Sequence, residues 1–187
     1  MTRRRPGGDT GTTNNDGSPM KKVAVVMGSA SDISVMEGAI EALHEFGVPV
    51  EVRVLSAHRT PDDALQFARD AQGNGFGVLI AGAGKAAHLA GVLAAVTSLP
   101  VIGVPIASGD LGGLDALLAM VQMPPGVPVA TVALDGARNA GLMAVRILAL
   151  SDDQLTDAYE NFRDGMATKV RSADEGIRAR YAEGGGS

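Results

Sequence analysis

The sequence predicts a three-layer α/β protein with a five-stranded parallel sheet between helices. Short runs rich in Val and Ile alternate with amphipathic stretches of about ten to fifteen residues, a pattern typical of βαβ units. The 187-residue chain is 45% hydrophobic and 20% charged, as expected of one globular domain. Because only 3% of it is aromatic, we expect a core of Val, Ala, Leu and Ile.

Five apolar runs are predicted as strands, and the near-continuous apolar character of three of them indicates a sheet covered on both faces. In chain order these strands are 23–27, 51–55, 77–81, 101–104 and 129–132. Helices are predicted at 33–46, 61–72, 86–96, 114–121 and 137–150. The second helix has the clearest start, with Thr60 as N-cap, Pro61 in the first position, and Asp62 and Asp63 facing the positive end of the helix dipole.

The two ends of the chain differ from this α/β domain, which we place at 21–150. Residues 1–20 are mostly Gly, Thr, Asn, Asp and Arg and are predicted to be a disordered tail. Residues 151–187 are predicted as an extra C-terminal helix, over 152–181, and a flexible end. The apolar stripe of this helix comprises Leu155, Tyr159, Phe162 and Met166. We expect this stripe to pack on a neighbouring subunit, with packing on its own domain as the alternative.

Composition excludes several classes of function. The absence of cysteine excludes disulfides, thiolate nucleophiles, iron–sulfur clusters and cysteine zinc sites. The net charge of -5 disfavours non-specific nucleic-acid binding. No apolar run reaches the ~20 residues of a membrane-spanning helix, and no signal-peptide segment is present, so we expect a cytoplasmic protein that contacts no membrane. The three histidines lack metal-ligand spacing, and His44 is expected on a solvated helix face, so no metal site is predicted.

The loops after the first three strands are the candidate ligand site. Ligands of doubly wound sheets bind at the carboxyl ends of the strands, and the flavodoxin-like order 2-1-3-4-5 makes these strands neighbours. The first loop runs from Gly28 through Ser29 and Ser31 to Asp32. Its free N–H groups and hydroxyls suit an anion, and Asp32 suits a sugar hydroxyl. The alternative is that Ser31 or Asp32 only caps the following helix.

The second loop reads Ser56-Ala57-His58-Arg59-Thr60-Pro61 and places an imidazole beside a guanidinium. Arg59 suits phosphate or carboxylate, and His58 suits proton transfer near neutral pH. The alternative makes Arg59 a surface charge and His58 a loop residue. We favour function, because Arg59 is one of only six Lys or Arg residues between Val23 and Leu150.

The third loop reads Ala81-Gly82-Ala83-Gly84-Lys85-Ala86-Ala87-His88-Leu89 and is predicted as a glycine turn that lets a ligand approach the backbone. It matches neither dinucleotide-binding nor P-loop spacing. Lys85 and His88 are one helical turn apart, so both could face the same cleft. The alternative is that His88 caps or packs and Lys85 is solvated.

These loops, followed by Gly103-Val104-Pro105 and the segment 121–129, resemble the class I PurE family, the N5-carboxyaminoimidazole ribonucleotide mutases of purine synthesis. The match runs from Val23 to Leu150, in order and with family spacing. The resemblance implies a flavodoxin-like catalytic domain in a homo-octamer, with active sites at subunit interfaces. It also implies movement of a carboxylate from N5 to C4 of the substrate without metal, ATP, biotin or any other cofactor.

The resemblance implies that Ser29, Asp32, Arg59 and loop backbone groups bind the ribose phosphate, and that His58 shuttles the proton. The full candidate site has two catalytic residues, His58 and His88, no metal ligand, and these substrate-binding residues: Gly28, Ser29, Ser31, Asp32, Ser56, Ala57, Arg59, Ala83, Gly84, Lys85 and Leu89.

Some residues favour one class of the resembled enzymes, and others depart from the family pattern. Arginine after His58 favours class I over class II enzymes, which use free CO2 and usually carry lysine there. Lys85 stands where the family usually has glycine, Ala90 stands where it has proline, and 108–113 fits loosely. Two alternatives stay open: a paralogue acting on a related nucleotide, and a non-catalytic nucleotide-binding module. A flavin or nicotinamide enzyme is disfavoured by missing fingerprints and few aromatic residues.

Overall fold

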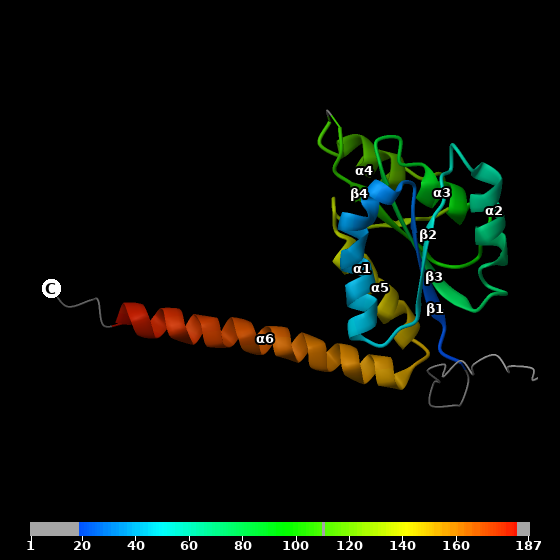
Figure 1. The fold of residues 1–187 in the computed structure, drawn as a ribbon. Coiled ribbons are helices and arrows are strands. Elements are labelled where there is room, and N and C mark those ends of the chain that lie inside the picture. The colour runs from blue at the N-terminus through cyan, green and yellow to red at the C-terminus, as the bar shows by residue number, and fades with distance from the viewer. Residues whose placement is uncertain (1–18, 110, 183–187) are drawn as a thin grey trace, which may run out of the picture.

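A computed structural model describes residues 19–109 and 111–182, so most of the predicted N-terminal tail lies outside the described residues. Its centre is a parallel sheet in the order β2-β1-β3-β4-β5, which confirms the predicted flavodoxin-like α/β fold (Figure 1). The strands are β1 (Lys22–Met27), β2 (Val50–Val54), β3 (Phe76–Gly84), β4 (Val101–Ile106) and β5 (Ala130–Thr131). The strand order reverses at β1, so the carboxyl ends of β1 and β3 flank the point where such folds bind ligands.

Helices cover both faces of the sheet, as the apolar strands predict. They are α1 (Ile33–Glu45), α2 (Pro61–Asp70), α3 (Leu89–Ala94), α4 (Leu114–Val121), α5 (Ala137–Ala149) and α6 (Asp153–Ala182), with a short 3-10 helix η1 (Ala30–Asp32) before α1. Helices α1 and α5 cover one face and form what we term the α1/α5 core. Helices α2, α3 and α4 cover the other face and form the α2/α3/α4 core.

Strand β3 continues three residues beyond its predicted end, so the segment Gly82–Gly84 is strand and the predicted glycine turn is wrong. These residues pair with β4, for example Gly82 with Val104 and Gly84 with Ile106. Glycine at position 82 lets the Met36 side chain of α1 pack against β3, because a Cβ there would overlap the Met36 sulfur and force that side chain to shift. The chain therefore turns only at Lys85, and α3 begins at Leu89 rather than at Ala86.

The start of α2 follows the prediction in part. Thr60 is at the N-cap position, Pro61 opens the helix, and Asp62 and Asp63 lie in the first turn. However, the Thr60 hydroxyl makes no capping bond to α2. It instead accepts a hydrogen bond from the Ser56 N–H at 3.0 Å and donates one to the Ser56 carbonyl at 3.3 Å. Thr60 therefore closes the second loop rather than the helix.

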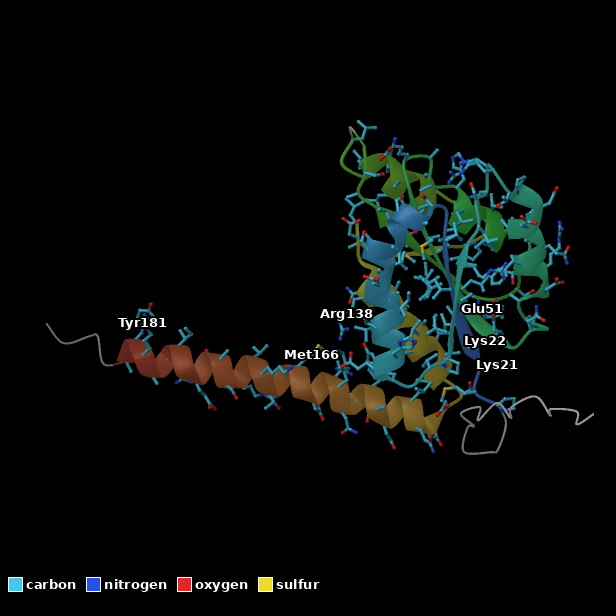
Figure 2. All side chains as sticks on the ribbon, in the orientation of Figure 1. Lys21, Lys22, Glu51, Arg138, Met166 and Tyr181 are labelled. Atoms are coloured by element: carbon cyan, nitrogen blue, oxygen red, sulfur yellow. The ribbon has the colours of Figure 1, made fainter. Side chains whose placement is uncertain are left out.

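The 30-residue helix α6 begins on its own domain and then projects away from it (Figures 1 and 2). Leu155 is only 3% exposed, and the rings of Tyr159 and Phe162 lie 5.9 and 5.5 Å from that of Phe46. From Thr168 to Ala182 every residue is exposed. The first turns thus follow the alternative of packing on their own domain, while packing of the rest on a neighbouring subunit stays a prediction. No helix in the described ranges is both long and apolar enough to cross a membrane.

Candidate active site

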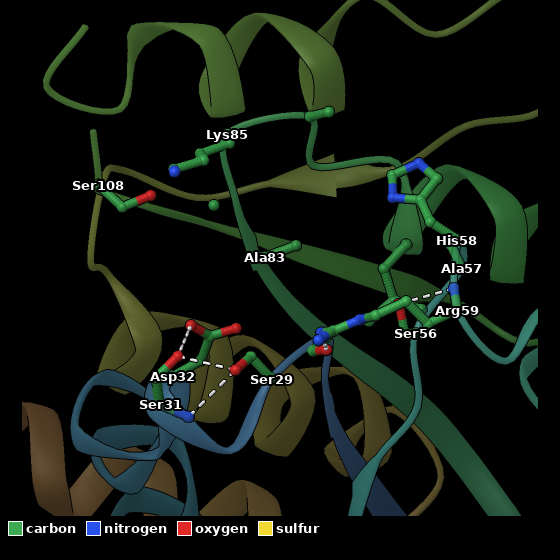
Figure 3. A pocket seen from close by; sticks show the side chains of 14 residues that line it. Ser29, Ser31, Asp32, Ser56, Ala57, His58, Arg59, Ala83, Lys85 and Ser108 are labelled. Carbon is green, nitrogen blue, oxygen red and sulfur yellow. Dashed lines mark hydrogen bonds between the residues drawn. The ribbon is translucent and has the colours of Figure 1, made fainter. Parts of the chain in front are cut away.

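The carboxyl ends of β1, β2, β3 and β4 surround a cleft of about 580 Å³ (Figure 3). Of the thirteen predicted site residues, all except His88 line it. The cleft is lined by Gly28, Ser29, Ser31, Asp32, Ser56, Ala57, His58, Arg59, Ala83, Gly84, Lys85, Ala86, Leu89 and Ser108. Sequence reasoning therefore missed Ala86 and Ser108. Ser108 was detectable, because β4 neighbours β3 and its carboxyl end must reach the same edge of the sheet.

The first loop presents a chain of hydroxyl groups to the cleft. The Ser29 oxygen caps η1 by accepting from the Ser31 N–H at 3.3 Å, so the capping residue is Ser29 rather than Ser31 or Asp32. The Ser31 hydroxyl lies 2.8 Å from Ser29 Oγ and 3.3 Å from Asp32 Oδ1. Asp32 makes no capping bond to α1, so its carboxylate remains available to accept hydrogen bonds from a hydroxylated ligand.

Arg59 joins the first two loops. Its Nη2 donates to the Gly28 carbonyl at 2.7 Å, and its Nε donates to Ser56 Oγ at 3.3 Å. The same Ser56 oxygen accepts the Arg59 backbone N–H at 3.1 Å. Holding a guanidinium by two of its donors removes rotamer freedom before any ligand arrives. The remaining donors of Arg59 are thus pre-positioned for an anion such as phosphate.

His58 and His88 form a pair. His58 Nε2 lies 2.9 Å from His88 Nδ1, and the two rings are inclined at 80°. If both rings are neutral, one nitrogen donates the proton of this hydrogen bond and the other accepts it. Since His58 lines the cleft and His88 does not, the geometry lets His88 fix the orientation of His58 while the His58 Nδ1 atom stays unpaired with any described residue.

Lys85 stands at the tip of the third loop in the left-handed backbone region, with φ of 54°. The following turn is tight: the Ala87 N–H donates to the Lys85 carbonyl and the His88 N–H to the Ala86 carbonyl, both at 2.8 Å. Lys85 and His88 therefore do not share a helix face. Lys85 lines the cleft and extends toward Ser108 (Figure 3). His88 instead contacts His58.

The cleft contains the chemistry of acid–base catalysis on an anionic, hydroxylated ligand. Within the described ranges, no three His, Cys, Asp or Glu side chains gather closely enough to hold a metal ion. An imidazole, a guanidinium and a hydroxyl-rich turn at the edge of a doubly wound sheet are the groups expected of an α/β enzyme that acts on an anionic, hydroxylated small molecule.

Comparison with known proteins identifies the family. The family model described as AIR carboxylase matches residues 22–169, and the chain belongs to this family. It is 56% identical over 157 residues to the N5-carboxyaminoimidazole ribonucleotide mutase of Mycobacterium leprae, covering 84% of this chain and 92% of that protein. It is 55% identical to the protein of the same name from Saccharolobus solfataricus, covering 82% and 97%. The predicted resemblance to the PurE family is thereby confirmed.

The fold is also that of a solved relative. The crystal structure of Treponema denticola PurE superposes with a TM-score of 0.78 at 26% sequence identity, covering 84% of this chain and 99% of that one. The family match ends at residue 169, within α6, so the distal turns of this helix lie beyond it.

Proposed function

We propose that the protein is an N5-carboxyaminoimidazole ribonucleotide mutase, which moves a carboxylate from N5 to C4 to give 4-carboxy-5-aminoimidazole ribonucleotide. The observation that carries this proposal is His58, which lines the cleft next to an anchored arginine and is held by His88. The names of the relatives, at 48–56% identity over most of the chain, support the same reaction.

The reaction needs one group that gives and takes a proton. The N5–carboxylate bond breaks, releasing CO2 in the cleft and leaving an aminoimidazole whose C4 is electron-rich. His58 supplies the proton that N5 gains. C4 then attacks the retained CO2, and His58 removes the proton that C4 loses, so the enzyme returns to its starting state. The net change is an isomerisation that consumes no co-reactant.

Arg59, Ser29 and Asp32 would bind the ribose phosphate in this proposal. The free donors of Arg59 and the N–H groups at the start of η1 suit the phosphate oxygens, while Asp32 accepts from a ribose hydroxyl. His88 acts through His58 and is a positioning residue in this account. The resemblance further favours a cytoplasmic homo-octamer with interfacial sites, for which light scattering should give a mass several times 19.0 kDa. A monodisperse monomer would contradict that assembly.

The test is turnover of N5-carboxyaminoimidazole ribonucleotide by the purified protein and two histidine variants. We expect His58→Asn to bind product within a few fold of wild type but to lose about 10²-fold or more in turnover. His88→Asn should lose less and should shift the pH profile of kcat, because it changes the partner of His58. His44→Asn, an exposed residue of α1 outside the cleft, is the matched control and should behave as wild type.

Two outcomes would reject the proposal or its mechanism. Wild-type protein that binds the nucleotide without converting it would instead be a paralogue or a non-catalytic binding module. Full turnover by His58→Asn would place the proton shuttle on another residue. Labelled bicarbonate adds a check, because a mutase that retains its own CO2 incorporates little label in a single turnover, whereas a carboxylase that uses free CO2 incorporates it fully.

A further inference from the structure

The cleft has two cationic side chains at different ends. Arg59 reaches toward β1, where it binds the Gly28 carbonyl, while Lys85 extends from the end of β3 toward Ser108 in the loop after β4 (Figure 3). Among the described residues lining the cleft, these are the only Lys or Arg side chains, and Asp32 is the only acid. Because the two cations lie at different ends of the cleft, a phosphate bound by Arg59 leaves Lys85 for a second anionic group on the ligand.

The position of Lys85 is specific. A residue with a Cβ rarely adopts φ of 54°, so the backbone tolerates strain to place a side chain here. The stem of Lys85 runs beside Gly109, where an added Cβ would lie 3.4 Å from Lys85 Cε. Thus the ammonium is carried across from the third loop to the loop after β4.

The Lys85 ammonium has no partner among the described residues. Whereas the Arg59 side chain makes hydrogen bonds to Gly28 and Ser56, the Lys85 side chain makes no hydrogen bond or ion pair with any residue in the described ranges. An ammonium carries three donors and a full charge, and it binds carboxylate as a point charge without needing a fixed plane.

We propose that Lys85 binds the carboxylate of the substrate and product, and so makes this enzyme select carboxylated nucleotides over 5-aminoimidazole ribonucleotide. This inference rests on the proposed function and names a specificity-determining residue for it. Arg59 and the first loop take the phosphate at one end of the cleft, and Lys85 takes the second anion at the other end. Because substrate and product both carry the carboxylate, Lys85 stabilises both bound acids and contributes little to the decarboxylated intermediate.

The experiment measures, by calorimetry at low and moderate salt, the binding of two nucleotides that differ only in this group. They are 4-carboxy-5-aminoimidazole ribonucleotide and 5-aminoimidazole ribonucleotide. Lys85→Met keeps the Cβ and most of the stem, so backbone strain and packing stay matched. We expect it to weaken binding of the carboxylated nucleotide about tenfold or more and to change binding of the other less than about twofold.

Two further variants serve as comparisons for Lys85→Met. Arg59→Ala should weaken both nucleotides by similar factors, because both carry the phosphate. Lys169→Met, which removes an exposed lysine of α6, should change neither. In turnover, Lys85→Met should raise KM while leaving kcat equal or higher, since the lost interaction stabilises the bound acid rather than the step that releases CO2.

Equal weakening of both nucleotides in Lys85→Met would overturn the proposal by assigning Lys85 to the phosphate, and no weakening of either would show a solvated side chain. Each of these leaves the proposed mutase function standing. Failure of wild type to bind either nucleotide would reject the mutase function, and the assignment of Lys85 with it.

Discussion

Gly141 allows α5 to approach α1 closely, and replacing it with alanine should loosen this contact. A Cβ at position 141 would lie 2.7 Å from the Ala39 carbonyl oxygen and 2.9 Å from the Ala42 Cβ, both in α1. Ala39 and Ala42 are fully buried and belong to a helix, so neither can rotate out of the way. The helices must instead move apart, which opens packing along the α1/α5 core.

The magnitude follows from two opposing effects. Overpacking a core typically costs 1–3 kcal/mol, and contacts with atoms held by the α1 backbone place Gly141→Ala in the upper part of this range, at about 2–3 kcal/mol. Alanine is favoured over glycine within a helix by roughly 1 kcal/mol, which offsets part of this cost. We therefore expect Gly141→Ala to lower the free energy of unfolding by about 1–2 kcal/mol. For a chain of 187 residues this corresponds to a fall in Tm of roughly 2–8 °C.

The assay is urea unfolding followed by circular dichroism at fixed protein concentration, with the slope m checked for constancy. The matched control is Gly165→Ala in α6, because the added Cβ has no heavy atom within 4 Å apart from its chain neighbours and the nearby backbone of α6, so only the helix preference acts. This control should be neutral or stabilising. A Gly141→Ala protein as stable as wild type, or a Gly165→Ala protein that loses as much stability, would contradict close packing of α5 on α1 at Gly141.

Two other perturbations test the site and the sheet edge. Gly84→Ala should weaken nucleotide binding, because the added Cβ would overlap Ser108 Oγ. Adding Ser108→Gly in the same chain should restore part of the lost affinity. A double variant that binds more weakly than either single variant would contradict this contact. The hydrogen bond from Lys22 at 2.8 Å lowers the pKa of Glu51 in the folded protein. The ionised Glu51 carboxylate therefore stabilises the fold at a pH above the pKa of Glu51 in the unfolded chain. This stabilisation is lost as the pH falls through the pKa of Glu51 in the folded protein. Glu51→Gln should therefore lower the free energy of unfolding by less than about 1 kcal/mol at neutral pH, and by less still below pH 4.5. Urea midpoints that shift equally at both pH values would refute this pH dependence.

Most of the fold and site could be predicted because both depend on local patterns. Alternation of apolar runs with amphipathic stretches identified all five strands, and the strand order follows from rules for parallel sheets. Once strands are placed, the residues after them must gather at one edge. That reasoning identified Ser29, Arg59 and His58 without any knowledge of their contacts.

The errors arose where tertiary contacts override local preference. Gly82–Gly84 looked like a turn, yet pairing with β4 keeps these residues extended. The spacing of one helical turn suggested that Lys85 and His88 could face the same cleft, because spacing does not reveal that a residue other than glycine adopts the left-handed conformation at Lys85. Periodicity also identified the apolar stripe of α6, but it does not tell which surface Leu155 will cover.

The two halves of the cleft are supported by different cores. Ser29–Asp32 lead directly into α1, whose buried residues pack with α5 in the α1/α5 core. His58 and His88 instead follow or adjoin members of the α2/α3/α4 core: Leu55 and Ala57 precede His58, and Ala87 and Leu89 flank His88. A disturbance of one core should therefore move one wall of the cleft against the other. Gly141→Ala, which separates α1 from α5, should consequently weaken the contribution of Ser29 and Asp32 to nucleotide binding more than it alters the histidine pair. Their loop leads into α1, whereas the histidines proposed to act in proton transfer adjoin the core on the opposite face of the sheet.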